Sequence, residues 1–407
     1  MADARCFVIV GASLAGAKAA QTLRDEGFEG RVVLLGDEPV RPYERPPLSK
    51  EYLQGKAGLD KVFVHDEDYY EEHDIDLRLT THVQSLDTAA REIVLSSGEH
   101  IAYDAALLTT GAAPRRLTVP GSGLHGQYFL RTLEDSDRLQ AAIRGAGRVV
   151  VIGGGWIGCE VAASARQLGA DVAVVEAADL PLERVLGPEL GSFYRDVHAD
   201  HGVAWHLGNG VEELRGSSQV EEVQLTDGTV VQGDIFVVGV GVVPRISIAE
   251  EAGLTVENGV VTDEFLQTSV AGVFAAGDVA DAWHPLFQTR IRLEHWSSAL
   301  NQGPVAAKNM LGRQVPYEKV PYFFSDQYDV GMEYSGYAPT WDEVVLRGDP
   351  ASREFIAFWL KDGRLAAGMN VNTWDVNDAI AAIVASQKPV DVDRLRDPDV
   401  ALAELVR

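Results

Sequence analysis

Two copies of one pattern constrain the fold of this chain more than any other feature. In each copy an apolar strand runs into a glycine-containing turn, a helix follows, and a second strand ends at an acidic residue. The first copy spans 7–38 and the second spans 148–176. This order is typical of a dinucleotide-binding βαβ unit, whose helix N-terminus offers free N–H groups to a pyrophosphate. We therefore expect two dinucleotide sites in one chain.

The second copy carries the more specific signal. Residues 153–158 read Gly-Gly-Gly-Trp-Ile-Gly, which is the full G-x-G-x-x-G spacing, and Glu176 ends the strand that follows. A carboxylate at this point can accept hydrogen bonds from both ribose hydroxyls and would repel a 2′-phosphate. The pattern therefore favours NAD, although Arg184 nearby leaves some tolerance of NADP open.

The first copy departs from the pattern at one position. Ser13 stands where the central glycine is expected between Gly11 and Gly16. A small side chain still lets the main chain approach a pyrophosphate, and the second strand leads to Asp37 and Glu38, where a ribose-binding acid belongs. The first copy therefore predicts a dinucleotide site as well.

The rest of the chain predicts strands, a rigid loop and two connecting segments. The prolines of 41–51 predict an extended loop, after which Ser49 could cap a short helix beginning at Lys50. Glycine and proline mark a boundary at 112–126, and a similar strand–glycine–proline segment recurs at 234–244. The remaining predicted elements are strands at 77–83, 92–95, 101–103, 105–111 and 272–279, a β-rich section at 203–231, and a helix at 295–311.

These elements predict an α/β protein with two Rossmann-like dinucleotide-binding domains and a C-terminal α+β domain. The expected boundaries are 1–112 and 242–320 for an outer domain, 113–241 for a domain inserted in it, and 321–407 for the third. The nested order suits FAD held by the outer domain and NADH held by the insert. Hydride would then pass between the two cofactors, whose own chemistry carries the reaction.

Composition excludes several classes of function. The net charge of −26 argues against nucleic-acid binding. No apolar run reaches the roughly 18 residues of a membrane span, and the first strand begins almost at once, so we expect a cytoplasmic protein without a membrane anchor. The two cysteines, Cys6 and Cys159, lie in different nucleotide-binding patterns and cannot form a C-x-x-C pair. We therefore expect no metal site, and electrons must leave the flavin for an external acceptor.

Taken together, these motifs resemble the FAD-dependent, NADH-using ferredoxin reductases of bacterial oxygenase systems, over essentially the whole chain. The stretches that carry the resemblance are 8–16, 45–50 (Arg-Pro-Pro-Leu-Ser-Lys), 150–160, Gly277-Asp278 and 324–328. Two positions depart from the family, which usually has Leu in place of Cys159 and Tyr, Phe or Val in place of Trp156. The change at Trp156 bears on access to the nicotinamide.

The resemblance implies a set of site residues. Those implied for FAD are Gly11, Ser13, Ala15, Gly16, Asp37, Arg45, Pro46, Lys50, Val83, Thr110, Gly111, Gly277, Asp278 and Trp296. Those implied for NADH are Gly153, Gly155, Trp156, Ile157, Gly158, Glu160, Glu176 and Gly239. Lys50 and Glu160 are the implied catalytic pair beside the reacting rings. The alternatives are that Lys50 is a surface lysine and that Glu160 is an acid in the first turn of a helix.

The implied activity is electron transfer from NADH through FAD to a [2Fe-2S] ferredoxin, or to a rubredoxin, that supplies an oxygenase. One alternative is an NADH oxidase or monodehydroascorbate-type reductase, and another is an interaction protein resembling apoptosis-inducing factor. Because ferredoxins are usually acidic and this chain is acidic too, electrostatic docking needs a local basic patch. The residues that could form one are Arg290, Arg292, Lys308 and Arg313.

Overall fold

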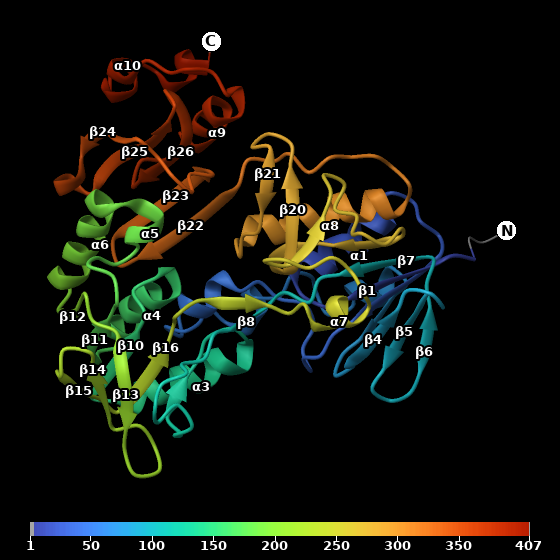
Figure 1. Ribbon diagram of the computed structural model, residues 1–407, viewed down its shortest axis with the longest axis horizontal. Coiled ribbons are helices and arrows are strands. Elements are labelled where there is room, and N and C mark those ends of the chain that lie inside the picture. Colours follow the sequence, from blue (N-terminus) through green and yellow to red (C-terminus); the bar gives the residue numbers. More distant parts are fainter. Residues whose placement is uncertain (1–3, 407) are drawn as a thin grey trace. The chain divides into compact units, whose positions relative to one another are not determined.

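The computed structural model describes residues 4–406, which divide into two compact units (Figure 1). Unit 1 comprises the chain up to Glu44 together with Val62–Ala113 and Val243–Tyr322. Unit 2 comprises Arg45–Lys61, Pro114–Val242 and the chain from Phe323 onward. Within the described residues, no helix combines the length and apolarity that crossing a membrane requires.

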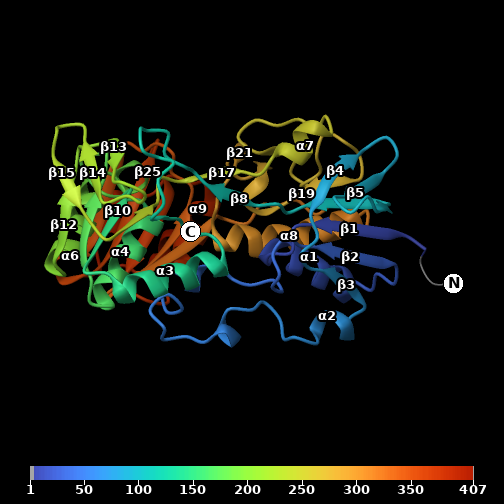
Figure 2. The same ribbon diagram turned by 90° about the horizontal axis from the view of Figure 1, so that it is seen from below.

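Unit 1 is built on a parallel five-stranded sheet of order β19-β7-β1-β2-β3. Its strands are β1 (Cys6–Val10), β2 (Arg31–Leu35), β3 (Ile75–Arg78), β7 (Ala105–Leu108) and β19 (Val273–Ala275). Side chains of β1 alternate between the two faces. Phe7 and Ile9 pack with α1 (Leu14–Asp25) and α8 (Trp296–Met310), which lie side by side (Figure 2).

The opposite face of this sheet packs on a small antiparallel sheet. Val8 and Val10 share a core with the strands β4 (Val83–Asp87), β5 (Glu92–Leu95) and β6 (His100–Ala102). The remaining elements of unit 1 are α2 (Tyr69–Glu72), α7 (Ser247–Glu251), β18 (Val260–Thr262), β20 (Ala280–His284), β21 (Thr289–Ile291), and the 3₁₀ turn η3 (Gly277–Val279). The carboxyl ends of β1 and β2 therefore open between a helical layer and a β layer.

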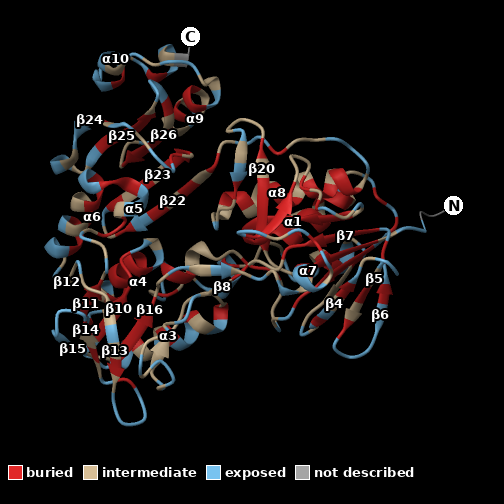
Figure 3. Cartoon of the chain, viewed as in Figure 1, coloured by how far each residue is buried: buried red, intermediate tan, exposed pale blue. Residues whose placement is uncertain are grey.

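Unit 2 repeats this plan. Its parallel sheet has the order β12-β11-β10-β16-β9, with strands β9 (Gln127–Tyr128), β10 (Arg148–Ile152), β11 (Asp171–Val175), β12 (Val203–His206) and β16 (Ile235–Val238). Val149 and Val151 of β10 pack with α3 (Leu133–Gly145) and α4 (Trp156–Gln167), whereas Val150 and Ile152 face the opposite way. That second face is covered by β13 (Val211–Arg215), β14 (Glu222–Leu225) and β15 (Val230–Gln232). Figure 3 shows β10 and α4 buried throughout most of their length.

The C-terminal part of unit 2 is an antiparallel sheet of order β22-β23-β26-β25-β24. Its strands are β22 (Tyr322–Gln327), β23 (Val330–Gly336), β24 (Glu343–Asp349), β25 (Glu354–Lys361) and β26 (Arg364–Val371). Unit 2 also contains the helices α5 (Glu183–Leu186), α6 (Pro188–Asp200), α9 (Asn377–Ser386) and α10 (Val392–Arg396), and the 3₁₀ turns η1 (Pro46–Ser49), η2 (Leu59–Lys61), η4 (Pro350–Ser352) and η5 (Leu402–Val406). Tyr194 and Val197 of α6 share an apolar core with Phe323, Phe355 and Trp359. The chain passes between the units at β8 (Ala112–Pro114) and β17 (Val242–Pro244).

Several local expectations from the sequence are wrong: the strands expected at 105–111 and 272–279 end early, at Leu108 and Ala275. No helix begins at Lys50, because the prolines start the 3₁₀ turn η1 four residues earlier, at Pro46, and Ser49 ends it. The strand expected at 77–83 is interrupted after Arg78, where Thr80 takes a left-handed backbone conformation with φ 50°. β4 then begins at Val83. The residues expected to form one strand are therefore divided between two strands, β3 and β4.

The division into units also differs from the expected domains. Arg45–Lys61 groups with unit 2, although the sequence places it in the outer domain. The C-terminal residues from Phe323 belong to the same unit as the expected inserted domain.

Candidate functional site

The turn after β1 is shaped for close approach of a ligand to the backbone. Gly11 has φ 121°, and a Cβ atom there would lie 2.2 Å from the carbonyl oxygen of Thr109. A Cβ atom on Gly16 would lie 2.2 Å from the carbonyl oxygen of Gly11, so this glycine lets α1 pack against the turn. Ser13 precedes α1 as its N-cap, and its side chain makes no capping hydrogen bond. The free N–H groups of α1 therefore remain available to a phosphate.

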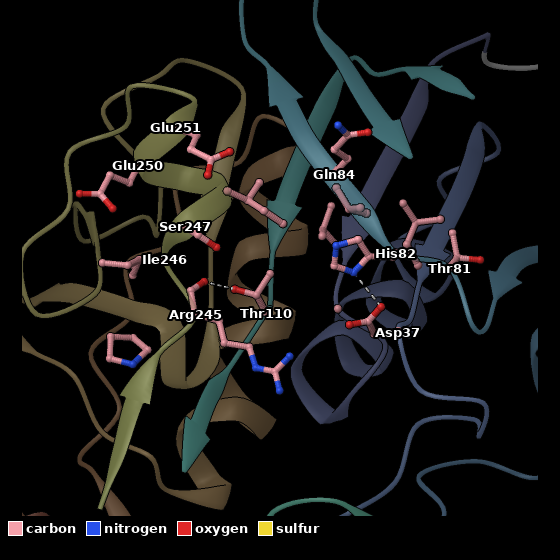
Figure 4. Close-up of a pocket in the computed structure, with 16 residues that line it drawn as sticks. Asp37, Thr81, His82, Gln84, Thr110, Arg245, Ile246, Ser247, Glu250 and Glu251 are labelled. Carbon is pink, nitrogen blue, oxygen red and sulfur yellow. Dashed lines mark hydrogen bonds and ion pairs between the residues drawn. The ribbon is translucent and has the colours of Figure 1, made fainter. Parts of the chain in front are cut away.

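A cavity of about 640 Å³ opens beside this turn (Figure 4). Four of the residues implied for FAD line it, namely Gly11, Asp37, Val83 and Thr110. Asp37 lies 3.0 Å from Nδ1 of His82, measured from its Oδ1 atom. Its carboxylate stands at the carboxyl end of β2, where the ribose of a dinucleotide is held in such folds.

Other residues implied for FAD gather where α1 meets α8. A Cβ atom on Gly277 would lie 3.3 Å from the Cβ of Ala15, and the Gly277 N–H donates to Oε1 of Gln302 at 2.7 Å. Asp278 is buried in the adjoining η3 turn. Trp296 is the first residue of α8, and burial raises the pKa of the Glu44 carboxyl, an effect that the Trp296 side chain opposes.

The remaining members of this set lie elsewhere. Gly111 does not line the cavity, and Arg45, Pro46 and Lys50 belong to unit 2. Arg45 donates a hydrogen bond from Nη1 to the carbonyl oxygen of Arg131. The proposed FAD residues are thus divided between the two units.

The turn after β10 repeats the geometry of the first. Gly153 has φ 108°, and a Cβ atom there would lie 2.4 Å from the carbonyl oxygen of Gly239. A Cβ atom on Gly158 would lie 1.9 Å from the carbonyl oxygen of Gly153. At Gly155 a Cβ atom would meet nothing within 4 Å, so this N-cap of α4 faces open space. The turn is therefore close-packed behind and open in front, as a pyrophosphate site requires.

A second cavity, of about 370 Å³, lies beside this turn. Five residues implied for NADH line it, namely Gly153, Gly155, Trp156, Glu176 and Gly239. Glu176 accepts hydrogen bonds from the Gly154 N–H at 2.5 Å and the Ala178 N–H at 2.8 Å. These bonds fix its carboxylate at the end of β11. Arg184 lines the same cavity.

Trp156 lines this cavity, and its ring packs in an aromatic cluster. Its ring meets Tyr194 edge-on at 5.5 Å between centroids, and Phe323 at 5.1 Å. Cys159 lies behind it, fully buried, and burial raises the pKa of its thiol. A thiol in that state is inert as a nucleophile. Ile157, in contrast, is 44% exposed and does not line the cavity.

The two implied catalytic residues form a buried ion pair. Nζ of Lys50 lies 2.8 Å from Oε1 of Glu160, so Lys50 is not a surface lysine. Helix α4 begins at Trp156, so Glu160 lies in its second turn. The alternative that Glu160 is an acid in the first turn of a helix is therefore wrong. Two hydroxyls also bind this carboxylate: Ser49 Oγ donates to Oε2 at 2.6 Å and Ser325 Oγ donates to Oε1 at 2.7 Å.

The surroundings of Lys50 are otherwise aromatic and acidic. Its ammonium lies 5.4 Å from the centre of the Phe324 ring. Asp326, on the same strand as Phe324, has its pKa raised by burial, with Lys50 opposing the effect. The charge of Lys50 is therefore balanced within unit 2 by Glu160 at contact distance and by Asp326 further away.

Both turns fit dinucleotides on these observations. Each has a glycine whose side-chain position is filled by neighbouring backbone, a helix N-terminus without a side-chain cap, and a carboxylate after the second strand. Within the described residues no group of His, Cys, Asp and Glu could hold a metal ion.

Several residues of these sites were not predicted from the sequence. Thr81, His82 and Arg245 line the first cavity, and His198 joins the hydrogen bonds around Glu160. Their positions depend on contacts between distant segments, and no sequence motif marks them. Ser49 was expected to cap a helix, but its hydroxyl binds Glu160 and the carbonyl oxygen of Pro46.

The four residues of the expected basic patch are all paired with carboxylates. Arg290 pairs with Glu257, and Arg292 pairs with Glu294. Lys308 and Arg313 both pair with Glu26. Because each cation lies beside a carboxylate, the four residues create little net positive field.

Comparison with known proteins agrees with this geometry. The sequence matches the family described as pyridine nucleotide-disulphide oxidoreductase over residues 6–303 and the family described as reductase C-terminal over 322–406. It is 38% identical to the 5,5′-dehydrodivanillate O-demethylase ferredoxin reductase subunit of Sphingobium sp., covering 98% of this chain and 97% of the relative. It is 35% identical to the rubredoxin-NAD(+) reductase of Pseudomonas putida, covering 90% and 95%.

The fold also matches that of a chain in a solved protein complex. The reductase chain in the covalent putidaredoxin reductase–putidaredoxin complex superposes with a TM-score of 0.95 at 35% identity, covering 99% of this chain and 98% of that one. Members of the matched family bind FAD and NAD(P)H. The chain therefore belongs to the pyridine nucleotide-disulphide oxidoreductase family, in the branch that carries the reductase C-terminal domain.

Proposed function

We propose that this chain is an FAD-dependent NADH:ferredoxin oxidoreductase that supplies electrons to an oxygenase. Its acceptor is a [2Fe-2S] ferredoxin, with a rubredoxin as the second candidate. What supports the proposal is likeness over nearly the full length to a ferredoxin reductase subunit, a rubredoxin reductase and a reductase solved with putidaredoxin.

The state of the two cysteines is the observation that supports a separate protein as the electron acceptor. Although the family is named for disulphide reductases, this sequence has two cysteines, and both are free thiols. Cys159 is fully buried with a raised pKa, and Cys6 is half-buried with its pKa also raised by burial. No dithiol can form beside the flavin, so the electrons must pass to a separate acceptor.

The chain's own residues then have defined tasks. Bound FAD would supply the chemistry that links a two-electron hydride donor to a one-electron acceptor. The turn at Gly11 and the start of α1 would hold its pyrophosphate, and Asp37 its ribose. The turn at Gly153–Gly155 would hold the NADH pyrophosphate, with Glu176 selecting the unphosphorylated ribose. Lys50 and Glu160 would act together as the charged pair at the reacting rings.

The same proposal gives the domains their roles. We assign 1–112 and 242–320 to FAD binding, 113–241 to NADH binding, and 321–407 to a C-terminal domain that borders the flavin and the acceptor. We also assign the protein to the cytoplasm, because free cysteines persist in a reducing compartment.

Anaerobic stopped-flow mixing tests this function. The FAD-loaded protein is reduced with one equivalent of NADH and then mixed with a [2Fe-2S] ferredoxin, a rubredoxin, oxygen or the monodehydroascorbate radical. We expect flavin absorbance to return rapidly with the ferredoxin or the rubredoxin and slowly with the other two. Rapid reoxidation by oxygen or by the radical would overturn the proposal, and reduction by NADH without reoxidation by any acceptor would favour an interaction protein.

A further inference from the structure

A line of buried polar side chains runs through unit 2 and ends at Glu160. Nε2 of His198 lies 2.7 Å from Oε1 of Gln327, and Nε2 of Gln327 donates to Oγ of Ser325 at 3.0 Å. The Ser325 hydroxyl in turn donates to Oε1 of Glu160 at 2.7 Å, the same oxygen that pairs with Lys50. Three elements contribute to the line: α6, β22 and α4.

Burial makes this line rigid. The relative exposure of His198 is 0%, that of Gln327 and of Ser325 is 1%, and that of Glu160 is 4%. A polar group this deep loses free energy when a hydrogen-bond partner moves away, because water cannot replace the partner. Each member therefore restricts the orientation of the next.

The protonation state of His198 gives the line a direction. Burial lowers the pKa of His198 to about 4, so the imidazole is neutral at pH 7. Its Nε2 carries the proton, because Oε1 of Gln327 can only accept, and its Nδ1 has no hydrogen-bond partner among residues 4–406. The ring packs edge-on against Trp205 and Tyr328.

All hydrogen bonds in the line point toward the carboxylate. His198 donates to Gln327, Gln327 donates to Ser325, and Ser325 donates to Glu160. Hydrogen bonds arranged head to tail polarise one another and strengthen the last donor. A donor of this kind stabilises a charged acceptor and fixes its orientation.

We propose that His198, Gln327 and Ser325 are positioning residues that hold the Glu160 carboxylate in the orientation in which it pairs with Lys50. Their effect on the reaction rests on the proposed function, in which Lys50 and Glu160 act at the flavin. None of the three needs to touch a cofactor. The line also makes the C-terminal strand β22 a direct determinant of the geometry around α4.

The test compares variants of the FAD-loaded, full-length protein. Ser325→Ala, Gln327→Leu and His198→Phe each break the line at one position, and His201→Phe on the segment directly after α6 is the matched control. Stopped-flow flavin reduction at saturating NADH gives the rate, its NADH dependence gives the dissociation constant, and redox titration gives the flavin midpoint potential. We expect rates at least about tenfold lower in the three variants, a shifted potential, and dissociation constants within about twofold of wild type, because each variant removes one donor from the line that ends at Glu160.

Rescue separates positioning from packing. His198→Gln places an amide N–H near the position of Nε2, so we expect it to recover most of the rate that His198→Phe loses. If the three variants lose FAD or stability but keep the rate and potential of each loaded flavin, or if His198→Gln is no better than His198→Phe, the positioning role is wrong.

A second measurement keeps this inference separate from the proposed function. In protein labelled with ¹⁵N-histidine, Lys50→Met should shift the Nε2–H resonance of His198, and the shift should vanish when Ser325→Ala is added. Failure of wild-type protein to be reduced by NADH would overturn the proposed function but leave this coupling intact. Absence of any Lys50-dependent shift at His198 would overturn the positioning line whether or not NADH reduces the flavin.

Discussion

The ammonium of Lys50 lies 2.8 Å from Oε1 of Glu160, and the two side chains are only 6% and 5% exposed. The loop that carries Lys50 and the helix that carries Glu160 are 110 residues apart in the chain, so the ion pair ties two distant segments together within unit 2. Removing one partner of such a pair leaves an uncompensated buried charge, which costs more free energy than removing both.

The first prediction concerns this ion pair. Glu160→Ala should lower the free energy of unfolding by about 3–5 kcal/mol, because it leaves the Lys50 ammonium buried without its carboxylate partner. Lys50→Met in the Glu160→Ala background should restore part of that loss, since neither charge then remains. Urea denaturation of the four proteins in a double-mutant cycle gives the coupling. Strictly additive effects would mean that the two charges do not stabilise each other.

Glu176 should determine the choice between NADH and NADPH. Glu176→Gln keeps a side-chain oxygen for the Gly154 N–H but removes the charge that would repel a 2′-phosphate. We expect the ratio of kcat/KM for NADH to that for NADPH to fall about tenfold, equivalent to about 1.4 kcal/mol. Glu212→Gln, an exposed acid on β13, removes the same charge from the same unit and serves as the control. If the ratio of kcat/KM for NADH to that for NADPH is unchanged in Glu176→Gln, Glu176 does not determine the choice of cofactor.

Arg245 should strengthen retention of FAD. Its side chain lines the first cavity with Gly11 and Asp37, and makes no hydrogen bond or ion pair within the part of the chain that the structure describes (Figure 4). An unpaired guanidinium beside a phosphate-binding turn is suited to bind a phosphate oxygen. Arg245→Met should raise the FAD dissociation constant about tenfold and reduce its salt dependence, and Arg245→Lys should do so less. Fluorescence titration of the apoprotein with FAD measures both, and equal affinity in wild type and Arg245→Met would contradict the role.

The glycine turns and their flanking elements could be predicted because their causes are local. A strand, a tight turn and a helix follow from neighbouring residues, and Gly11 and Gly153 indeed take the positive φ values that other residues avoid. The carboxylates after the second strands follow from the same spacing. Their side chains line the two cavities.

The partners of Glu160 could not be predicted in the same way. Ser325 is 165 residues away and His198 reaches the carboxylate only through Gln327 and Ser325, so no spacing in the sequence relates them. The failed strand at 77–83 has a different cause. Its residues alternate as a strand should, but Thr80 adopts a left-handed conformation that ends the pairing.

The four basic residues around α8 should contribute little to docking. Arg290→Gln and Lys308→Gln each remove a cation that already pairs with a carboxylate, so the local field changes little. We expect kcat/KM for ferredoxin to change by less than about twofold and its dependence on ionic strength to stay the same. Steady-state reduction of ferredoxin between low and high salt checks this. A fivefold loss at low salt that disappears at high salt would restore the basic patch.

The stability of the protein should fall between pH 6.5 and pH 4 through His198. Its pKa is lowered to about 4 by burial, so in this range the unfolded chain binds a proton that the folded protein does not. The stabilisation is therefore complete above pH 6.5, is lost as pH falls, and stops changing below pH 4.

For His198 alone the loss between pH 7 and pH 5 should be about 2 kcal/mol. His198→Gln cannot take up a proton, so the difference in unfolding free energy between pH 7 and pH 5 should be smaller by that amount in the variant. Urea denaturation of both proteins at the two pH values gives the comparison, in which the titration of the many carboxylates cancels. Equal pH dependence in the two proteins would show that His198 is not held neutral in the fold.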